Sequence, residues 1–109
     1  MILPSLTSAE TNYIAFDIVS TDYHIALYGY LQHKIGDKNV KDTDTHIKSC
    51  SCYNASIHSK LTSFKTTTYE TLPTAIRNAI HHPSPSTNFT QEELRTSTEL
   101  LIEILKNTP

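Results

Sequence analysis

Apolar residues recur at intervals of three and four along most of this chain, the spacing that places side chains on one face of an α-helix. The pattern predicts four helices, which run from Ser8 to Gly36, over 47–64, from Thr71 to Pro83 and from Thr90 to Leu105. No segment alternates in the manner of a convincing strand. We therefore expect an all-α, up-and-down four-helix bundle. With 109 residues, the chain should form one domain spanning 1–109.

Residues that start or stop helices flank these segments. Gly36 is a typical C-terminal stop, and Pro83 disfavours helical geometry in the residue before it. Thr90 and Glu93 have the spacing of a capping box, in which each side chain accepts a hydrogen bond from the other residue's backbone. The stretch 37–45 between the first two helices is polar and is expected to be turn-like.

Composition limits the class of protein. Hydrophobic residues make up 38% of the chain, which is enough for a core, and the formal net charge is −2. A dedicated nonspecific nucleic-acid binder is normally basic, so any contact with nucleic acid should be local or transient, or assisted by another component. No apolar run approaches the ~20 residues of a membrane span. Together with two cysteines, Cys50 and Cys52, that sit too close for an ordinary disulfide, this predicts a soluble cytoplasmic protein with free thiols.

The segment richest in chemically useful groups is 77–82, at the end of the third predicted helix. It contains Arg77, Asn78, His81 and His82. A guanidinium matches the geometry of a phosphate, and an imidazole exchanges protons near neutral pH. In RNA the 2′-hydroxyl is an internal nucleophile, so cleavage needs only proton transfer and stabilisation of the charged phosphorane. The residue types therefore favour RNA cleavage without a metal.

Helix geometry leaves the choice of histidine open. Arg77 and His81 are one turn apart and share a helix face. His82 is displaced by about 140° on an ideal helix, but it precedes Pro83 and can leave regular helical geometry. Both imidazoles are therefore candidates.

This segment resembles the Arg-x(4–6)-His signature of HEPN domains, helical bundles found in RNA-cleaving toxins and anti-phage defence proteins. The resemblance rests on 77–82 and on the layout of the predicted helices. It implies a metal-independent endoribonuclease without cofactors, acting on RNA as a homodimer with a composite site. It assigns phosphate binding to Arg77, substrate positioning to Asn78 and proton transfer to His82. It also implies a toxin–antitoxin or anti-phage role, with an antitoxin or a larger defence complex as a further partner.

Two other interpretations stay open. The chain could be a non-catalytic HEPN-like dimerisation or adaptor module, or a small subunit of a defence complex. Alternatively, the cationic residues of 77–82 could simply interact with the helix dipole at its C-terminal end. A zinc site built from His46, Cys50, Cys52 and His58 is disfavoured, because their spacing lacks the paired pattern of structural sites.

Overall fold

The computed structural model describes residues 19–83 and 88–108. In these ranges the chain forms helices α2 (Thr21–Lys34), α3 (Val40–Ser49), α4 (Ala55–His58), α5 (Leu72–His81) and α6 (Gln91–Lys106), and strands β1 (Ser59–Phe64) and β2 (Thr67–Thr71). The strands pair as an antiparallel hairpin between α4 and α5. The fold is mixed α/β, so the prediction of an all-α four-helix bundle is wrong.

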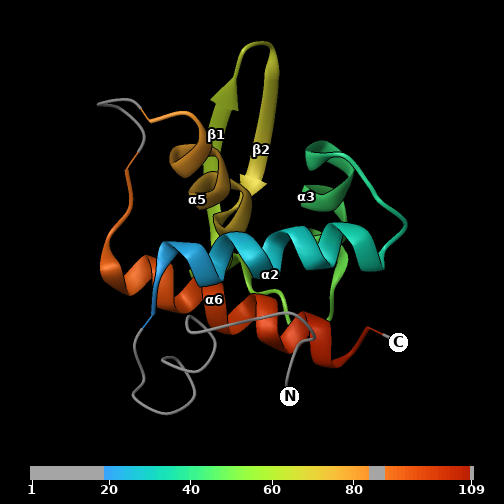
Figure 1. Cartoon of the computed structure of the whole chain (residues 1–109). Helices are drawn as coiled ribbons and strands as arrows, with labels where there is room; N and C mark the ends of the chain where they lie inside the picture. The colour runs from blue at the N-terminus through green and yellow to red at the C-terminus, as the bar shows by residue number, and fades with distance from the viewer. Residues whose placement is uncertain (1–18, 84–87, 109) are drawn as a thin grey trace.

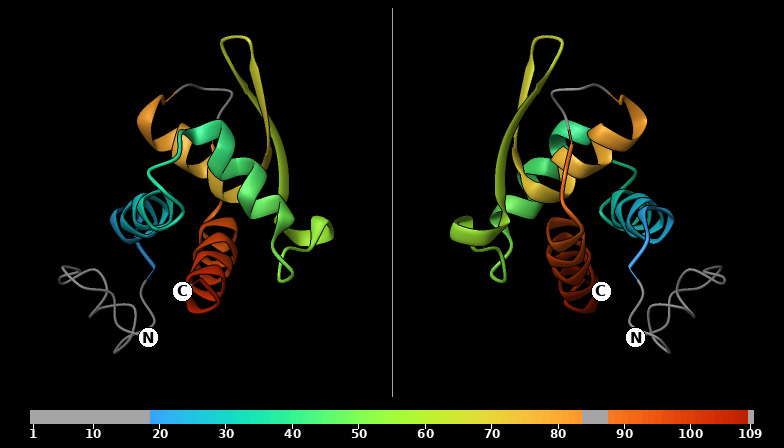
Figure 2. Two further views of the ribbon diagram at one scale, coloured as in Figure 1. Left: turned by 90° about the vertical axis from the view of Figure 1, so that its right-hand side faces the viewer. Right: turned by 90° about the vertical axis from the view of Figure 1, so that its left-hand side faces the viewer.

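The helices pack in two levels beside the hairpin. Figure 1 shows α2 running along α6, with α5 next to them and the hairpin rising beyond α5. Figure 2 looks down α2 and α6 and shows α5 lying across them, with the hairpin at the edge of the molecule. The larger core cluster joins α2 and α6 to α3 and includes Leu27, Tyr28, Leu31, Ile47, Leu101 and Ile104. A smaller cluster joins α5 to α6 and consists of Val19, Leu72, Ile76 and Leu94.

The first predicted helix is only partly correct. Its expected start, Ser8, lies outside the described residues. Helix α2 begins at Thr21, because Ser20 is extended (φ −129°) and its hydroxyl accepts the Tyr23 N–H at 3.1 Å. An uninterrupted helix from Ser8 is therefore wrong. The predicted end near Gly36 is confirmed, since Gly36 has a φ of 103°, a value that suits glycine.

The second predicted helix, 47–64, is wrong. Helix α3 starts earlier, at Val40, within the stretch expected to be turn-like, and β1 occupies the end of the segment. The apolar spacing was misleading because two of its members face solvent: Ile57 is 57% exposed and Leu61 is 74% exposed. The segment 59–71 is instead rich in threonine and aromatic residues, which favour strands.

The hairpin closes through an atypical turn. Phe64 pairs with Thr67, which leaves Lys65 and Thr66 as the loop. Lys65 has a φ of 55°, a backbone conformation usually taken by glycine or asparagine in hairpin turns. Because neither residue type is present in this loop, the sequence carries no standard hairpin signal.

The third and fourth predicted helices are confirmed. Helix α5 begins after Thr71 and ends before Pro83, and helix α6 begins after Thr90. Both arms of the capping box form: Thr90 N–H donates to Glu93 Oε1 at 2.9 Å, and Glu93 N–H donates to Thr90 Oγ1 at 3.0 Å.

The capping box supplies a stability test. Thr90→Ala removes the acceptor of the Glu93 N–H and should lower the free energy of unfolding by about 1 kcal/mol. Thr90→Ser keeps the hydroxyl and should remain close to the wild type. Urea unfolding followed by circular dichroism measures both variants, and an equal loss in both would contradict a role for the hydroxyl.

Candidate functional site

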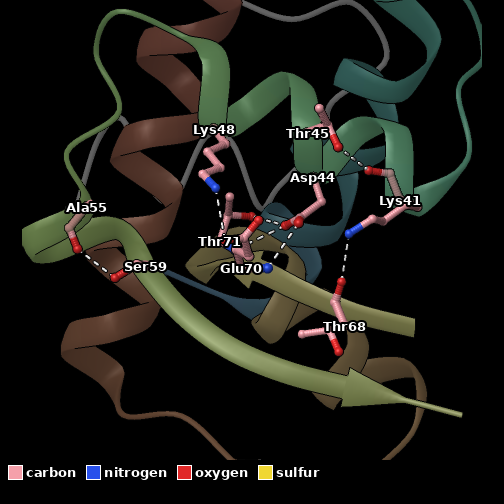
Figure 3. Close-up of polar contacts among 9 residues, drawn as sticks. All are labelled: Lys41, Asp44, Thr45, Lys48, Ala55, Ser59, Thr68, Glu70 and Thr71. Atoms are coloured by element: carbon pink, nitrogen blue, oxygen red, sulfur yellow. Dashed lines mark hydrogen bonds and ion pairs between the residues drawn. The ribbon is translucent and has the colours of Figure 1, made fainter. Parts of the chain in front are cut away.

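The start of α5 is fixed by a buried carboxylate from α3. Thr71, the N-cap residue, makes no side-chain bond of the usual capping kind. Instead, Asp44 Oδ1 accepts the Thr71 N–H at 3.1 Å and the Thr71 hydroxyl at 2.6 Å, and Asp44 Oδ2 accepts the Glu70 N–H at 3.0 Å (Figure 3). A negative charge at a helix N-terminus is also favourable for the helix dipole. Asp44 therefore ties α3 to the end of β2 and the beginning of α5.

The same carboxylate ends a chain of buried hydroxyl groups. The Thr71 and Thr74 hydroxyls are 3.1 Å apart, and the Tyr28 hydroxyl lies 2.8 Å from that of Thr74. Burial raises the pKa of Tyr28, so the phenol stays protonated. This network joins α2, α3 and α5 and holds the helix that carries the candidate site.

The candidate site lies at the opposite, C-terminal end of α5. Arg77 and Asn78 are half-buried, whereas His81 and His82 are exposed. Arg77 Nη1 donates a hydrogen bond of 2.8 Å to Asn78 Oδ1. This bond orients the guanidinium.

His81 lies in a cationic neighbourhood. Partial burial lowers its pKa, and the Arg77 guanidinium and His82 lower it further, since a positive charge disfavours the imidazolium. His81 is therefore neutral in a larger fraction of molecules near pH 7. The neutral imidazole is the form that accepts a proton. This electrostatic effect is consistent with the expectation, drawn from their spacing, that Arg77 and His81 lie on one face of the helix.

His82 leaves the helix and turns toward the hairpin. It is the C-cap of α5 (φ −133°, ψ 69°), and its N–H donates to the Asn78 carbonyl at 2.8 Å. Its ring stacks on Phe64, with centroids 4.2 Å apart and planes at 16°. The His81 and His82 ring centroids are 6.5 Å apart. Sequence reasoning missed Phe64, because it placed that residue on the apolar face of a helix.

The structure therefore places all of the predicted site residues at one helix end. Arg77 is hydrogen-bonded to Asn78, and the His82 ring stacks on Phe64. Among the contacts of residues 19–83 and 88–108, no hydrogen bond joins Arg77 to His82. The roles assigned to these residues remain predictions.

A second cluster of reactive groups lies between the end of α3 and the end of α6. His46, Cys50, Cys52 and Asn107 line a pocket of about 320 Å³. Burial raises the pKa of both thiols, so they are less reactive than exposed cysteines. His58 is engaged elsewhere, where its Nδ1 accepts the Asn54 N–H at 2.8 Å. In the described part of the chain, no three His, Cys, Asp or Glu side chains are placed to hold a metal ion.

Comparison of the chain with protein families, curated proteins and solved structures finds no match. Of the helices in the two described ranges, none combines the length and apolar character needed to cross a membrane. Functional interpretation therefore depends on the chemistry of the site.

Proposed function

We propose that the C-terminal end of α5 is an RNA-cleaving site that acts without a metal ion. The observation that carries the proposal is the clustering of a guanidinium, an amide and two imidazoles at one accessible helix end: Arg77, Asn78, His81 and His82. Desolvation, together with the nearby Arg77 and His82, lowers the pKa of His81 and adds a group suited to accept a proton. The Arg-x4-His spacing shared with HEPN domains supports the same chemistry, although the bundle expected from it is absent.

The proposed reaction is an internal transesterification of RNA. One imidazole takes the proton of the 2′-hydroxyl, whose oxygen attacks the adjacent phosphorus. The bond from phosphorus to the 5′-oxygen breaks, and that oxygen takes a proton from the other, protonated imidazole. The products are a 2′,3′-cyclic phosphate and a 5′-hydroxyl. Arg77 would neutralise the phosphorane charge and Asn78 would hold Arg77 in place.

The two histidines have different surroundings in this scheme. The lowered pKa of His81 suits it to accept the first proton. His82, which matches the Arg-x4-His spacing, would then donate to the leaving oxygen.

The biological setting is a further part of the proposal. By its motif, the protein would act as a homodimer in a toxin–antitoxin or anti-phage system, with an antitoxin or defence complex as a possible regulator. The net charge of −2 favours a second candidate, a dimerisation or adaptor module without catalytic activity. A stable dimer that leaves diverse RNAs intact would favour this module over the enzyme.

RNA digestion tests the enzyme directly. The wild type should cleave a fluorescent single-stranded RNA in the presence of EDTA and leave a 2′,3′-cyclic phosphate. Arg77→Ala should reduce the rate by about 10²–10³-fold and His82→Ala by about 10²–10⁴-fold. His33→Ala, which changes an exposed histidine at the end of α2, is the matched control and should keep full activity. Cleavage that requires a divalent metal, or that survives both site substitutions, would overturn the proposal.

A further inference from the structure

The tip of the β1–β2 hairpin reaches the candidate site. Strand β1 ends at Phe64, and the next residue, Lys65, begins the two-residue turn that pairs Phe64 with Thr67. Figure 1 shows the hairpin standing beside α5, and α5 packs against both strands. The Phe64 ring lies 4.2 Å from the His82 ring, and the planes are nearly parallel at 16°.

The ring of His82 has few other constraints. Its residue has left the helix, so helical geometry no longer fixes the direction of its side chain. Within residues 19–83 and 88–108, no hydrogen bond reaches either ring nitrogen, and the residue is exposed. Among the described residues, face-to-face stacking on Phe64 is thus the contact that sets the orientation of the His82 ring.

The hairpin tip also holds the Phe64 ring. Phe64 is half-buried, and the Lys65 ammonium lies over its ring, 5.5 Å from the centroid. A cation over an aromatic face is attracted by the electron density of the ring. Backbone pairing with Thr67 fixes the main chain at the same position. Phe64 is therefore a restrained surface against which the His82 imidazole is aligned.

We propose that Phe64 is a positioning residue, which orients the His82 imidazole for proton transfer. This inference rests on the proposed function, because it assigns the stack a purpose in RNA cleavage. It gives the hairpin a part in the site, although no residue of the hairpin was expected there. Misplacement of a catalytic group by about 1 Å can cost on the order of 10²-fold in rate, so such a restraint has a measurable effect.

Two substitutions of Phe64 distinguish the effect of a flat aromatic ring from the effect of apolar volume alone. Phe64→Tyr keeps the stacking surface and should retain kcat within about threefold, whereas Phe64→Leu should lower kcat by about 10–100-fold with little change in KM. Leu61→Ala, at an exposed position of the same strand, is the matched control and should leave kcat unchanged. Equal activity of Phe64→Leu and the wild type would overturn the inference.

A double mutant distinguishes positioning from a general structural role. If Phe64 acts through His82, Phe64→Leu should have no further effect on kcat in a His82→Ala background. The same fold-loss in both backgrounds would show that Phe64 acts independently of His82, and would overturn the inference.

Proton NMR of the His82 ring supplies a readout that does not depend on cleavage. The His82 ring-proton shifts should change in Phe64→Leu and stay close to wild type in Phe64→Tyr, because ring current depends on stacking. Unchanged shifts in Phe64→Leu would overturn the inference whether or not RNA is cut. If the wild type cuts no RNA but the shifts respond as expected, the proposed function fails while the orienting effect of Phe64 is supported.

Discussion

Replacing Asp44 with alanine should lower the free energy of unfolding by about 3–5 kcal/mol. Asp44 is only 1% exposed, and its carboxylate accepts three hydrogen bonds, from the Glu70 N–H, the Thr71 N–H and the Thr71 hydroxyl. Alanine would leave these donors buried without an acceptor. It would also remove the negative charge at the N-terminus of α5. The midpoint of urea unfolding, followed by circular dichroism, measures the loss.

Two further variants identify the cause of this loss. Asp42→Ala changes an exposed aspartate on the same helix and should shift stability by less than about 0.5 kcal/mol. Asp44→Asn keeps one carbonyl oxygen as an acceptor and should fall between the wild type and Asp44→Ala. If Asp42→Ala and Asp44→Ala were equally destabilising, loss of a helix N-terminal charge on α3, rather than loss of the buried bonds, would explain the effect.

The helices that could be predicted from the sequence are those with local signals at both ends. Helix α6 begins at a capping box, and α5 lies between Thr71 and Pro83, so short-range chemistry sets their bounds. The cluster at 77–82 was predictable for the same reason, because its members are neighbours along one helix. Local sequence therefore placed these side chains at one helix end, where the Arg77 guanidinium contributes to lowering the pKa of His81 after burial.

The hairpin could not be predicted because its signals are weak or conflicting. Ile57 and Leu61 have helical spacing but are exposed, and the Lys65–Thr66 turn lacks glycine and asparagine. Backbone pairing and packing against α5 outweigh the local pattern in this segment. This error also concealed the contact of Phe64 with His82.

The role of Asp44 was hidden for a related reason. It lies in the polar stretch 37–45, which was expected to be turn-like. Its partners, Glu70 and Thr71, are distant in the sequence, so the bonds depend on the tertiary fold. A charged residue becomes a buried anchor here only because the hairpin returns the chain to α3.

The stability of the fold should decrease as the pH falls below about 6.5, because one histidine is buried in its neutral form. His24 is 0% exposed, its Nε2 lies 2.7 Å from Ser97 Oγ, and its Nδ1 has no hydrogen-bond partner among the described residues. Burial lowers the pKa of His24 from 6.5 to about 3. Protonating this ring inside the α2–α6 interface would place an unpaired charge in the core.

The direction of the effect follows from proton binding. Between pH 6.5 and about 3 the unfolded chain carries a proton on His24 and the folded protein does not. The unfolded state is therefore favoured as pH falls, at roughly 1.4 kcal/mol per pH unit for a single group. Over the whole window this amounts to roughly 5 kcal/mol, a large share of the stability of a small domain.

Substitution isolates this contribution from that of other titrating groups. His24→Gln cannot titrate, and its amide can still hydrogen-bond to Ser97, so its stability should depend less steeply on pH between 6.5 and 3 than that of the wild type. Glu93, whose pKa is lowered mainly by hydrogen bonds and the charge of Lys60, also loses stabilisation in acid, but it does so in both proteins and cancels in the comparison. His33→Gln, at an exposed position of the same helix, removes only a solvent-exposed pair with Asp37 and should change the slope far less than His24→Gln. Urea unfolding at a series of pH values gives the slopes. Parallel slopes for the wild type and His24→Gln would mean that His24 is solvated or protonated in the folded protein, contrary to the buried neutral ring at the α2–α6 interface.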